Sequence, residues 1–292
     1  MTIIAILIAF ALCHFVRELG RCRNSAWLGK WVKFANDAFS GLPSWSGVTG
    51  FIVLMALPLF GLLLLNEVFT SLLGSTGWFL LALAVLVYSF GPRDLDTDIA
   101  EVVAAEEPER TEKLAELTGQ TMPEDADACR AVAVESVFQQ ALRRWFGVIF
   151  WFAVLGIVGA FLYRMIDWLV QDELGLTEEQ HGLFLHMQQI MDWPAAQLMT
   201  LALAISTDFD SVLKAWKQYH DKQGHGLFEG DNGFLLAAAR SVVLTGHAAR
   251  DGYADQLEGP LVSLQQAMDL VWRMLGVWMT ALALLLLIGV IV

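Results

Sequence analysis

The chain is poor in basic residues and in cysteine. It has 18 Lys and Arg against 31 Asp and Glu, for a net charge of −13. Because nucleic-acid binding needs clustered basic residues that displace counterions, this balance argues against a nucleic-acid partner. The three cysteines, Cys13, Cys22 and Cys129, are widely separated. They match neither a disulfide framework nor a zinc spacing, so we expect inert thiols in a reducing environment.

Phosphate and calcium motifs are also missing. The glycine-rich stretch 224–233 (GHGLFEGDNG) has no GK[ST] and no Gly-x-Gly-x-x-Gly, which favours a flexible turn between helices over a phosphate cradle. The run DLDTD at 94–98 suggests a calcium loop. That loop requires glycine at its sixth position and a carboxylate at its twelfth, where Ile99 and Ala105 stand.

The histidines do not have a metal-binding spacing. His181 and His186 are five residues apart, as are His220 and His225, which puts each pair of rings about 140° apart on a helix. Helical metal pairs use spacings of three or four. Gly-x-Ser-x-Gly is absent as well. We therefore predict no metal site, no cofactor and no catalytic residue.

What the chain has in abundance is apolar sequence. Hydrophobic residues make up 56% of it and the mean hydropathy is +0.54, more than soluble domains use. We predict an all-α polytopic membrane protein, a single integral membrane domain over 1–292. Apolar runs predict four firm transmembrane helices, over 47–66, 71–90, 146–163 and 274–292. They also predict a marginal N-terminal helix over 1–16 and a short or interfacial span over 191–206.

Basic residues predict the orientation. Residues 17–46 carry five Lys or Arg, and 91–144 and 207–273 carry six each, which favours the cytoplasm for all three. Residues 165–190 carry none, so we expect them outside, and then 191–206 must cross. The alternative leaves 191–206 in the interface. No basic residue precedes the first apolar run, which favours a retained anchor helix over a cleaved signal.

The stretch from Val134 to Arg164 joins a polar helix to an apolar segment. Glu135, Gln139 and Arg143 follow four-residue spacing and are predicted to share one helical face. Several polar or small residues nearby have simple structural explanations. Arg143 and Arg144 fit lipid phosphates, Arg164 and Asp167 a helix-end ion pair, and Gly156 and Gly159-Ala160 close helix packing.

This stretch resembles a known family. The pattern VES…FWF…G..GA..YR, with Glu135-Ser136 and Phe150-Trp151-Phe152, is similar to the membrane proteins that include adenosylcobinamide-phosphate synthase. Asp192-Trp193 and the cluster Arg143-Arg144-Trp145-Phe146 resemble the AmpE group of that family more closely. The resemblance implies a multi-pass protein of the bacterial inner membrane.

The differences from the synthase pattern bear on activity. The synthase has an acid and Asn where this chain has Gln139-Gln140, and Asp-Gly where it has Arg143-Arg144. Joining a carboxylate to an amine with ATP needs acids for magnesium and a base, and amides cannot supply a base. The resemblance thus implies a protein that is not an enzyme.

The AmpE-like features imply a regulatory role in the response to β-lactams or cell-wall breakdown products, through β-lactamase induction. The partner would be a small cell-wall fragment or a membrane protein. The alternatives are a synthase-type enzyme acting on a polar metabolite, and a plain structural partner of another membrane protein. We predict that a non-catalytic polar pocket is formed by Glu135, Gln139, Arg143, Arg144, Arg164, Asp167 and Asp192.

Overall fold

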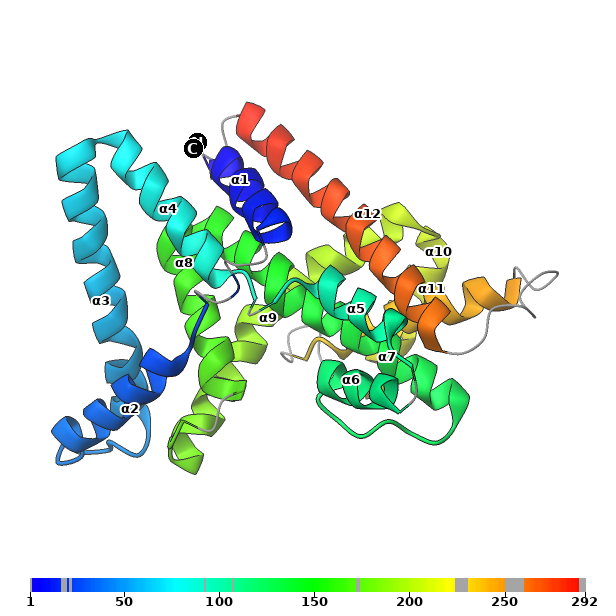
Figure 1. Cartoon of the computed structure of the whole chain (residues 1–292), viewed down its shortest axis with the longest axis horizontal. Helices are drawn as coiled ribbons and strands as arrows, with labels where there is room; N and C mark the ends of the chain where they lie inside the picture. Colours follow the sequence, from blue (N-terminus) through cyan, green and yellow to red (C-terminus); the bar gives the residue numbers. More distant parts are fainter. Residues whose placement is uncertain are drawn as a thin grey trace. The chain divides into compact units, whose positions relative to one another are not determined.

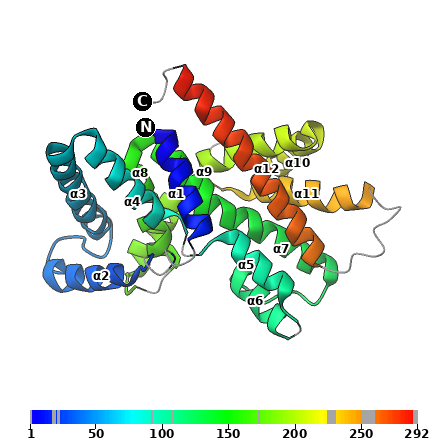
Figure 2. The same ribbon diagram turned by 45° about the horizontal axis from the view of Figure 1, so that its top comes forward.

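In the computed structural model, the described part of the chain consists of helices joined by turns and loops, with no strand (Figures 1 and 2). The all-α prediction is confirmed. Cys22, His225, most of the glycine-rich stretch 224–233 and the end of the last predicted span lie outside the described residues, whereas Cys13 and Cys129 are half-buried. The described residues are 2–16, 20, 23–91, 93–106, 108–171, 174–223, 231–249 and 260–288, without the side chains of 245–249 and 260.

The helices fall into two compact units, which we describe separately. The first unit contains 1–92, 143–192 and 286–292, and the second contains 93–142 and 193–285. The helices of the first unit are α1 (Thr2–Phe15), α2 (Ala26–Phe39), α3 (Val48–Leu73), α4 (Ser75–Ser89), α8 (Gly147–Gln171) and α9 (Glu178–Ser206) as far as Asp192. Helix α4 packs against α1, α3 and α8, and so forms the centre of this unit.

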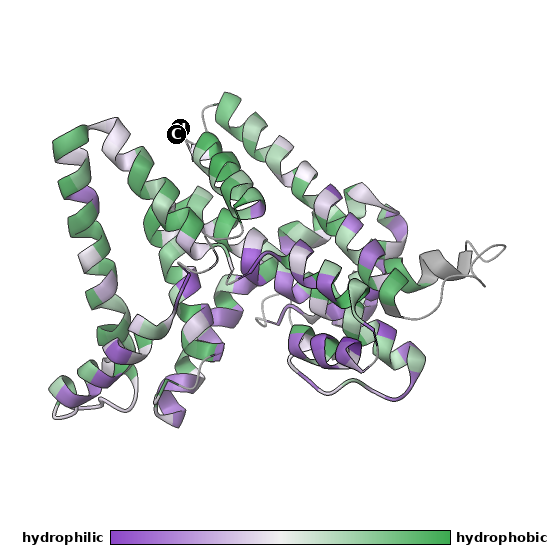
Figure 3. Ribbon diagram, viewed as in Figure 1, coloured by the Kyte–Doolittle hydropathy of each residue, from purple (hydrophilic) through white to green (hydrophobic). Residues whose placement is uncertain are grey.

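In the described part of the chain, three helical runs are by length and composition able to cross a membrane: Val48–Leu73, Ala126–Gln171 and Leu261–Leu287. Helix α3 leaves Leu57, Phe60 and Leu64 exposed, and Figure 3 shows the hydrophobic colouring along it. Such a surface is stable in lipid rather than in water. The chain is thus a membrane protein. Helices α1 and α4 are apolar but shorter, so their crossing, like the single membrane domain, stays a prediction.

Helix α8 is not straight. Gly156 has φ +65° and ψ −147°, values outside the helical region, and it divides α8 into two arms, 147–155 and 157–171. The arms lie against each other: a Cβ at Gly147 would overlap the ring of Tyr163. In a straight helix these two residues would be about 24 Å apart. The apolar run expected to form one span over 146–163 is therefore a folded-back pair of helices.

The segment after α8 lies beside the segment before α3. Hydrogen bonds between the two segments cannot form across a bilayer. The prediction that 165–190 and 17–46 lie on opposite sides of the membrane is therefore wrong. Acidic composition alone could not reveal that α8 turns back. The bonds are Thr177 Oγ1 to Ser46 O (2.6 Å), Gln180 Nε2 to Trp45 O (2.6 Å) and Asn36 Nδ2 to Gly175 O (3.3 Å).

The second unit is built around α7 and α11. Helix α11 packs against α7 and α10, while α5 and α6 pack with each other and with α7. The Asp125 carboxylate accepts a hydrogen bond from Ala128 N (2.8 Å) and so caps the start of α7. The helices of the second unit are α5 (Leu95–Ala104), α6 (Glu109–Thr118), α7 (Ala126–Ala141), the rest of α9, α10 (Phe209–Gln223), α11 (Gly233–Ala249) and α12 (Pro260–Leu287).

A π-helical turn, Leu142–Phe146, follows α7 directly. A π turn holds more residues than an α turn, so the four-residue spacing of Glu135 and Gln139 does not continue to Arg143. Moreover, Glu135 and Gln139 belong to the second unit and Arg143 to the first. The prediction of one shared polar face is corrected for Arg143.

Candidate functional site

The second arm of α8 carries a buried ion pair. Arg164 and Asp167 are 1% and 2% exposed, and Arg164 Nη1 lies 2.6 Å from Asp167 Oδ2. Residues three apart on a helix are neighbours, which is why this pair could be predicted from spacing. What the spacing did not show is that the pair is completely buried. A charge leaves water at low cost only when it is paired and hydrogen-bonded.

Arg164 uses its remaining donors on backbone carbonyls. Its Nε donates to Ser89 O, at the end of α4, and its Nη2 donates to Arg143 O at 2.9 Å. The planar guanidinium suits such a fork of fixed donors. One side chain thus joins α4, the π-helical turn and the second arm of α8.

The network continues through Asp167 to α9. Asp167 Oδ1 accepts a hydrogen bond from Gln188 Nε2 (3.1 Å), and Gln188 Oε1 accepts one from Arg143 Nη2 (3.2 Å). Asp192 Oδ1 then accepts the hydroxyl of Tyr163 (2.6 Å), and its Oδ2 lies 3.8 Å from Arg143 Nε. Two arginines therefore face two aspartates, and the formal charges of the network balance.

A second basic group lies where α4 ends. Arg23 is 6% exposed and donates from Nη1 to Gly91 O at 2.7 Å. Among the described residues, its Nε and Nη2 have no hydrogen-bond partner, and the buried hydroxyl of Ser89 has none either. Gly91 N in turn donates to Arg144 O (3.5 Å), and the Arg144 stem packs against Gly91. Buried guanidinium donors of this kind could hold a phosphate or carboxylate.

Polar residues of the second unit form separate pairs. Arg240 Nη1 lies 3.3 Å from Glu135 Oε1, and Asn232 Nδ2 donates to Gln139 Oε1 at 3.5 Å. Burial raises the pKa of Glu135, and the nearby Arg240 opposes that rise. Arg240 also lines an open cavity of about 380 Å³ between residues of α10 and α11: Ala215, Gln218, Tyr219, Ala237, Arg240, Ser241 and Leu244.

The predicted pocket is therefore divided. Arg143, Arg164, Asp167 and Asp192 are joined in the buried network, and Arg144 lies beside Gly91 in the same unit. The remaining two, Glu135 and Gln139, face Arg240 and Asn232 in the second unit. Residues that the sequence did not single out are Arg23, Ser89, Tyr163 and Gln188. Arg23 counted only among the basic residues of 17–46 and Tyr163 only as the last residue of the predicted span 146–163, since their partners are distant in the chain.

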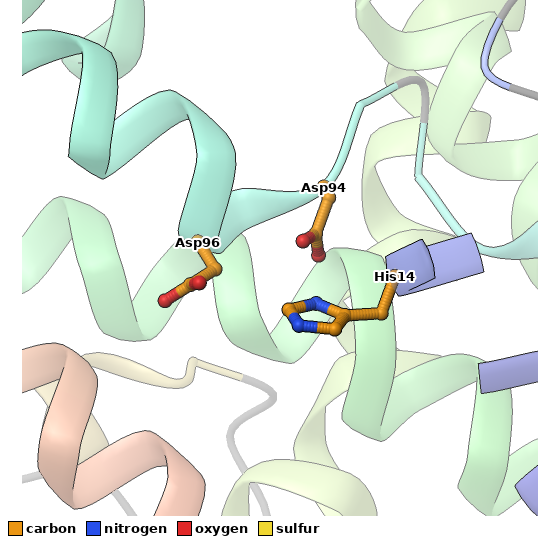
Figure 4. A group of neighbouring side chains, drawn as sticks. All are labelled: His14, Asp94 and Asp96. Atoms are coloured by element: carbon orange, nitrogen blue, oxygen red, sulfur yellow. The ribbon is translucent and has the colours of Figure 1, made fainter. Parts of the chain in front are cut away.

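Figure 4 labels His14, near the end of α1, and Asp94 and Asp96, at the start of α5. Histidine and carboxylate side chains are common metal ligands. His14 belongs to the first unit and the aspartates to the second, so we assign no metal to them.

Comparison with known proteins supplies the family. Residues 3–267 match the family model described as CobD/Cbib protein. The chain belongs to the CobD/Cbib family. It is also 28% identical over 234 residues to the "Cobalamin biosynthesis protein CobD" of Stutzerimonas stutzeri (strain A1501), an alignment that covers 73% of this chain and 74% of that protein. No solved structure matches.

The CobD/Cbib match confirms the resemblance noted in the sequence at the level of the family. It extends over both units and includes the buried network and Arg23. These residues are therefore part of the region that the chain shares with its family, and not of an appended segment.

Proposed function

We propose that this CobD/Cbib protein acts on a polar metabolite in the bacterial inner membrane, as an enzyme of the adenosylcobinamide-phosphate synthase type. The observation that carries the proposal is the family match over 3–267, together with a relative named for cobalamin biosynthesis. The buried basic group at Gly91 supports it chemically, because Arg23 offers two unpaired donors to an anionic group.

In this proposal, Arg23 and Arg164 have different roles. Arg23, which donates to Gly91 O, binds the anionic group of the metabolite, and Arg164 fixes the nearby end of α4 by donating to Ser89 O.

A second candidate is an AmpE-type regulatory protein of the β-lactam response, and residue chemistry favours it. The synthase's two acids in this stretch are replaced by Gln139 and Arg143, and neither an amide nor a guanidinium side chain can serve as a base. The structure gives these residues and Gln140 structural partners: Gln140 Nε2 donates to Leu117 O (3.3 Å), Gln139 Oε1 accepts from Asn232 Nδ2, and Arg143 joins the buried network. In this candidate function, a non-catalytic site binds a cell-wall fragment and so senses it.

Ligand-dependent thermal stability separates the two candidates. The full chain, purified in detergent, is heated with magnesium–ATP, a cobinamide precursor or a muropeptide. For the synthase-type enzyme we expect stabilisation by the nucleotide and precursor, by about 2.7 kcal/mol at a hundredfold excess over Kd. Arg23→Met should remove the shift, whereas Arg130→Met, at an exposed pair with Asp127, should keep it.

Other outcomes have definite meanings. Stabilisation by the muropeptide alone would contradict the synthase-type proposal and support the regulatory candidate. No response to any of the three would contradict ligand binding in both candidates and favour a structural partner, which co-purification would then identify.

The regulatory candidate makes its own prediction at Gln139. Gln139→Ala is expected to abolish β-lactamase induction without lowering the amount of protein, because Gln139 is half-buried and outside the Arg164 network. Arg143→Ala is less informative because it also breaks bonds to Gln188. Induction is measured by reporter assay and protein level by immunoblot; unchanged induction would reject the candidate.

A further inference from the structure

The interruption in α8 has the same geometry as the turn between α3 and α4. Gly74, at that turn, has φ +60° and ψ −140°, close to the φ +65° and ψ −147° of Gly156. Residues with a side chain essentially do not adopt such angles. Both glycines therefore permit a sharp reversal that other residues would resist.

The match extends to a second glycine three residues later. A Cβ at Gly77 would overlap the carbonyl oxygen of Phe69, and a Cβ at Gly159 would overlap that of Trp151. In each case the carbonyl lies five residues before the turn glycine. The chain thus uses one Gly-x-x-Gly device twice, and the first use is a plain helical hairpin between two separate helices.

The two arms of α8 stay together away from the turn. Gly159 meets Trp151 nearest the turn, and Tyr163 meets Gly147 four residues further along each arm. Beyond these, Arg164 Nη2 donates to the carbonyl of Arg143. Steps back along one arm are matched by steps forward along the other, which is the register of an antiparallel hairpin.

The hairpin has an apolar tip and a charged base. Val154 and Leu155, beside the turn, are 55% and 50% exposed. The base holds the buried network of Arg143, Arg164 and Asp167. The first arm rises about 13 Å, while the hydrocarbon core of a bilayer is about 30 Å thick. The second arm, 157–171, rises about 22 Å, so neither arm is long enough to cross that core.

We propose that α8 is a re-entrant hairpin whose tip enters the lipid and whose two ends leave on one membrane face. The partner of the exposed tip is the acyl region of the bilayer. The segment 174–190 then shares a side with 17–46, as its hydrogen bonds to Trp45 and Ser46 require independently. By the bias of basic residues that side is the cytoplasm. This inference holds for either candidate function.

Cysteine labelling tests the sidedness. In a background with Cys13, Cys22 and Cys129 changed to Ser, single cysteines replace exposed residues and are treated with a membrane-impermeant maleimide. Intact spheroplasts are compared with inverted vesicles. We expect Glu178→Cys to react like Ser40→Cys, before α3, and opposite to Ser75→Cys, at the start of α4. The three probes are exposed at their positions.

The tip is tested by its depth. A nitroxide attached to Val154→Cys in nanodiscs should be several-fold more accessible to oxygen than to a water-soluble nickel chelate, with the reverse for Ser40→Cys. Labelling of Glu178→Cys from the same side as Ser75→Cys would show that α8 crosses the membrane, and would overturn the proposal. A Val154 label open to the chelate would equally overturn it, since the tip would then lie in water.

Discussion

Arg164→Met is expected to lower the free energy of unfolding by about 3–5 kcal/mol, the usual cost of removing one partner from a buried ion pair. The change leaves the carboxylate of Asp167, which is 2% exposed, without its cation. It also removes the donors to Ser89 O and Arg143 O. Equilibrium unfolding of the purified protein in detergent measures the loss.

Arg130→Met is the matched control. Arg130 and Asp127 also form an Arg–Asp pair three residues apart on a helix, but Asp127 is 87% exposed. Exposed pairs contribute about 0–1 kcal/mol, so this variant should be nearly as stable as the parent. Equal losses for the two arginine variants would show that the Arg164 pair is not buried in the folded protein.

A double variant separates the charge pair from the other bonds of Arg164. Arg164→Met combined with Asp167→Leu should lose less stability than the two single changes added together, because no unpaired charge is left buried. Strict additivity would mean that the two side chains do not interact.

Gly156→Ala is expected to lower the free energy of unfolding by about 1–3 kcal/mol, because only glycine tolerates its backbone angles without strain. Adding Gly159→Ala should increase the loss, since its Cβ would overlap the carbonyl oxygen of Trp151. The measurement is again equilibrium unfolding in detergent, with the amount of folded protein followed by size-exclusion chromatography.

Gly276→Ala provides the comparison for this second prediction. Gly276 lies within α12 with open space around its Cβ position, so alanine should leave stability unchanged or raise it by about 0.5–1 kcal/mol. If Gly156→Ala were as stable as Gly276→Ala, residue 156 would be helical and α8 would be a straight helix.

Apolar composition and helical periodicity by themselves determined that this is an all-α membrane protein, because both depend on neighbouring residues only. The same is true of the Arg164–Asp167 pair, whose members are three residues apart on one helix. The pattern around Glu135 and Phe150-Trp151-Phe152 was enough to indicate the family that the comparison then confirmed.

Only the tertiary structure decided how the apolar run 146–163 is folded. A straight span and a hairpin have the same composition, and the choice depends on the backbone angles of Gly156. The buried network was likewise hidden, since Arg164 meets Ser89 and Tyr163 meets Asp192 across long stretches of chain. Once α8 turns back, Arg164 lies beside Arg143, which is the physical reason that these two residues share one site although they are 21 positions apart.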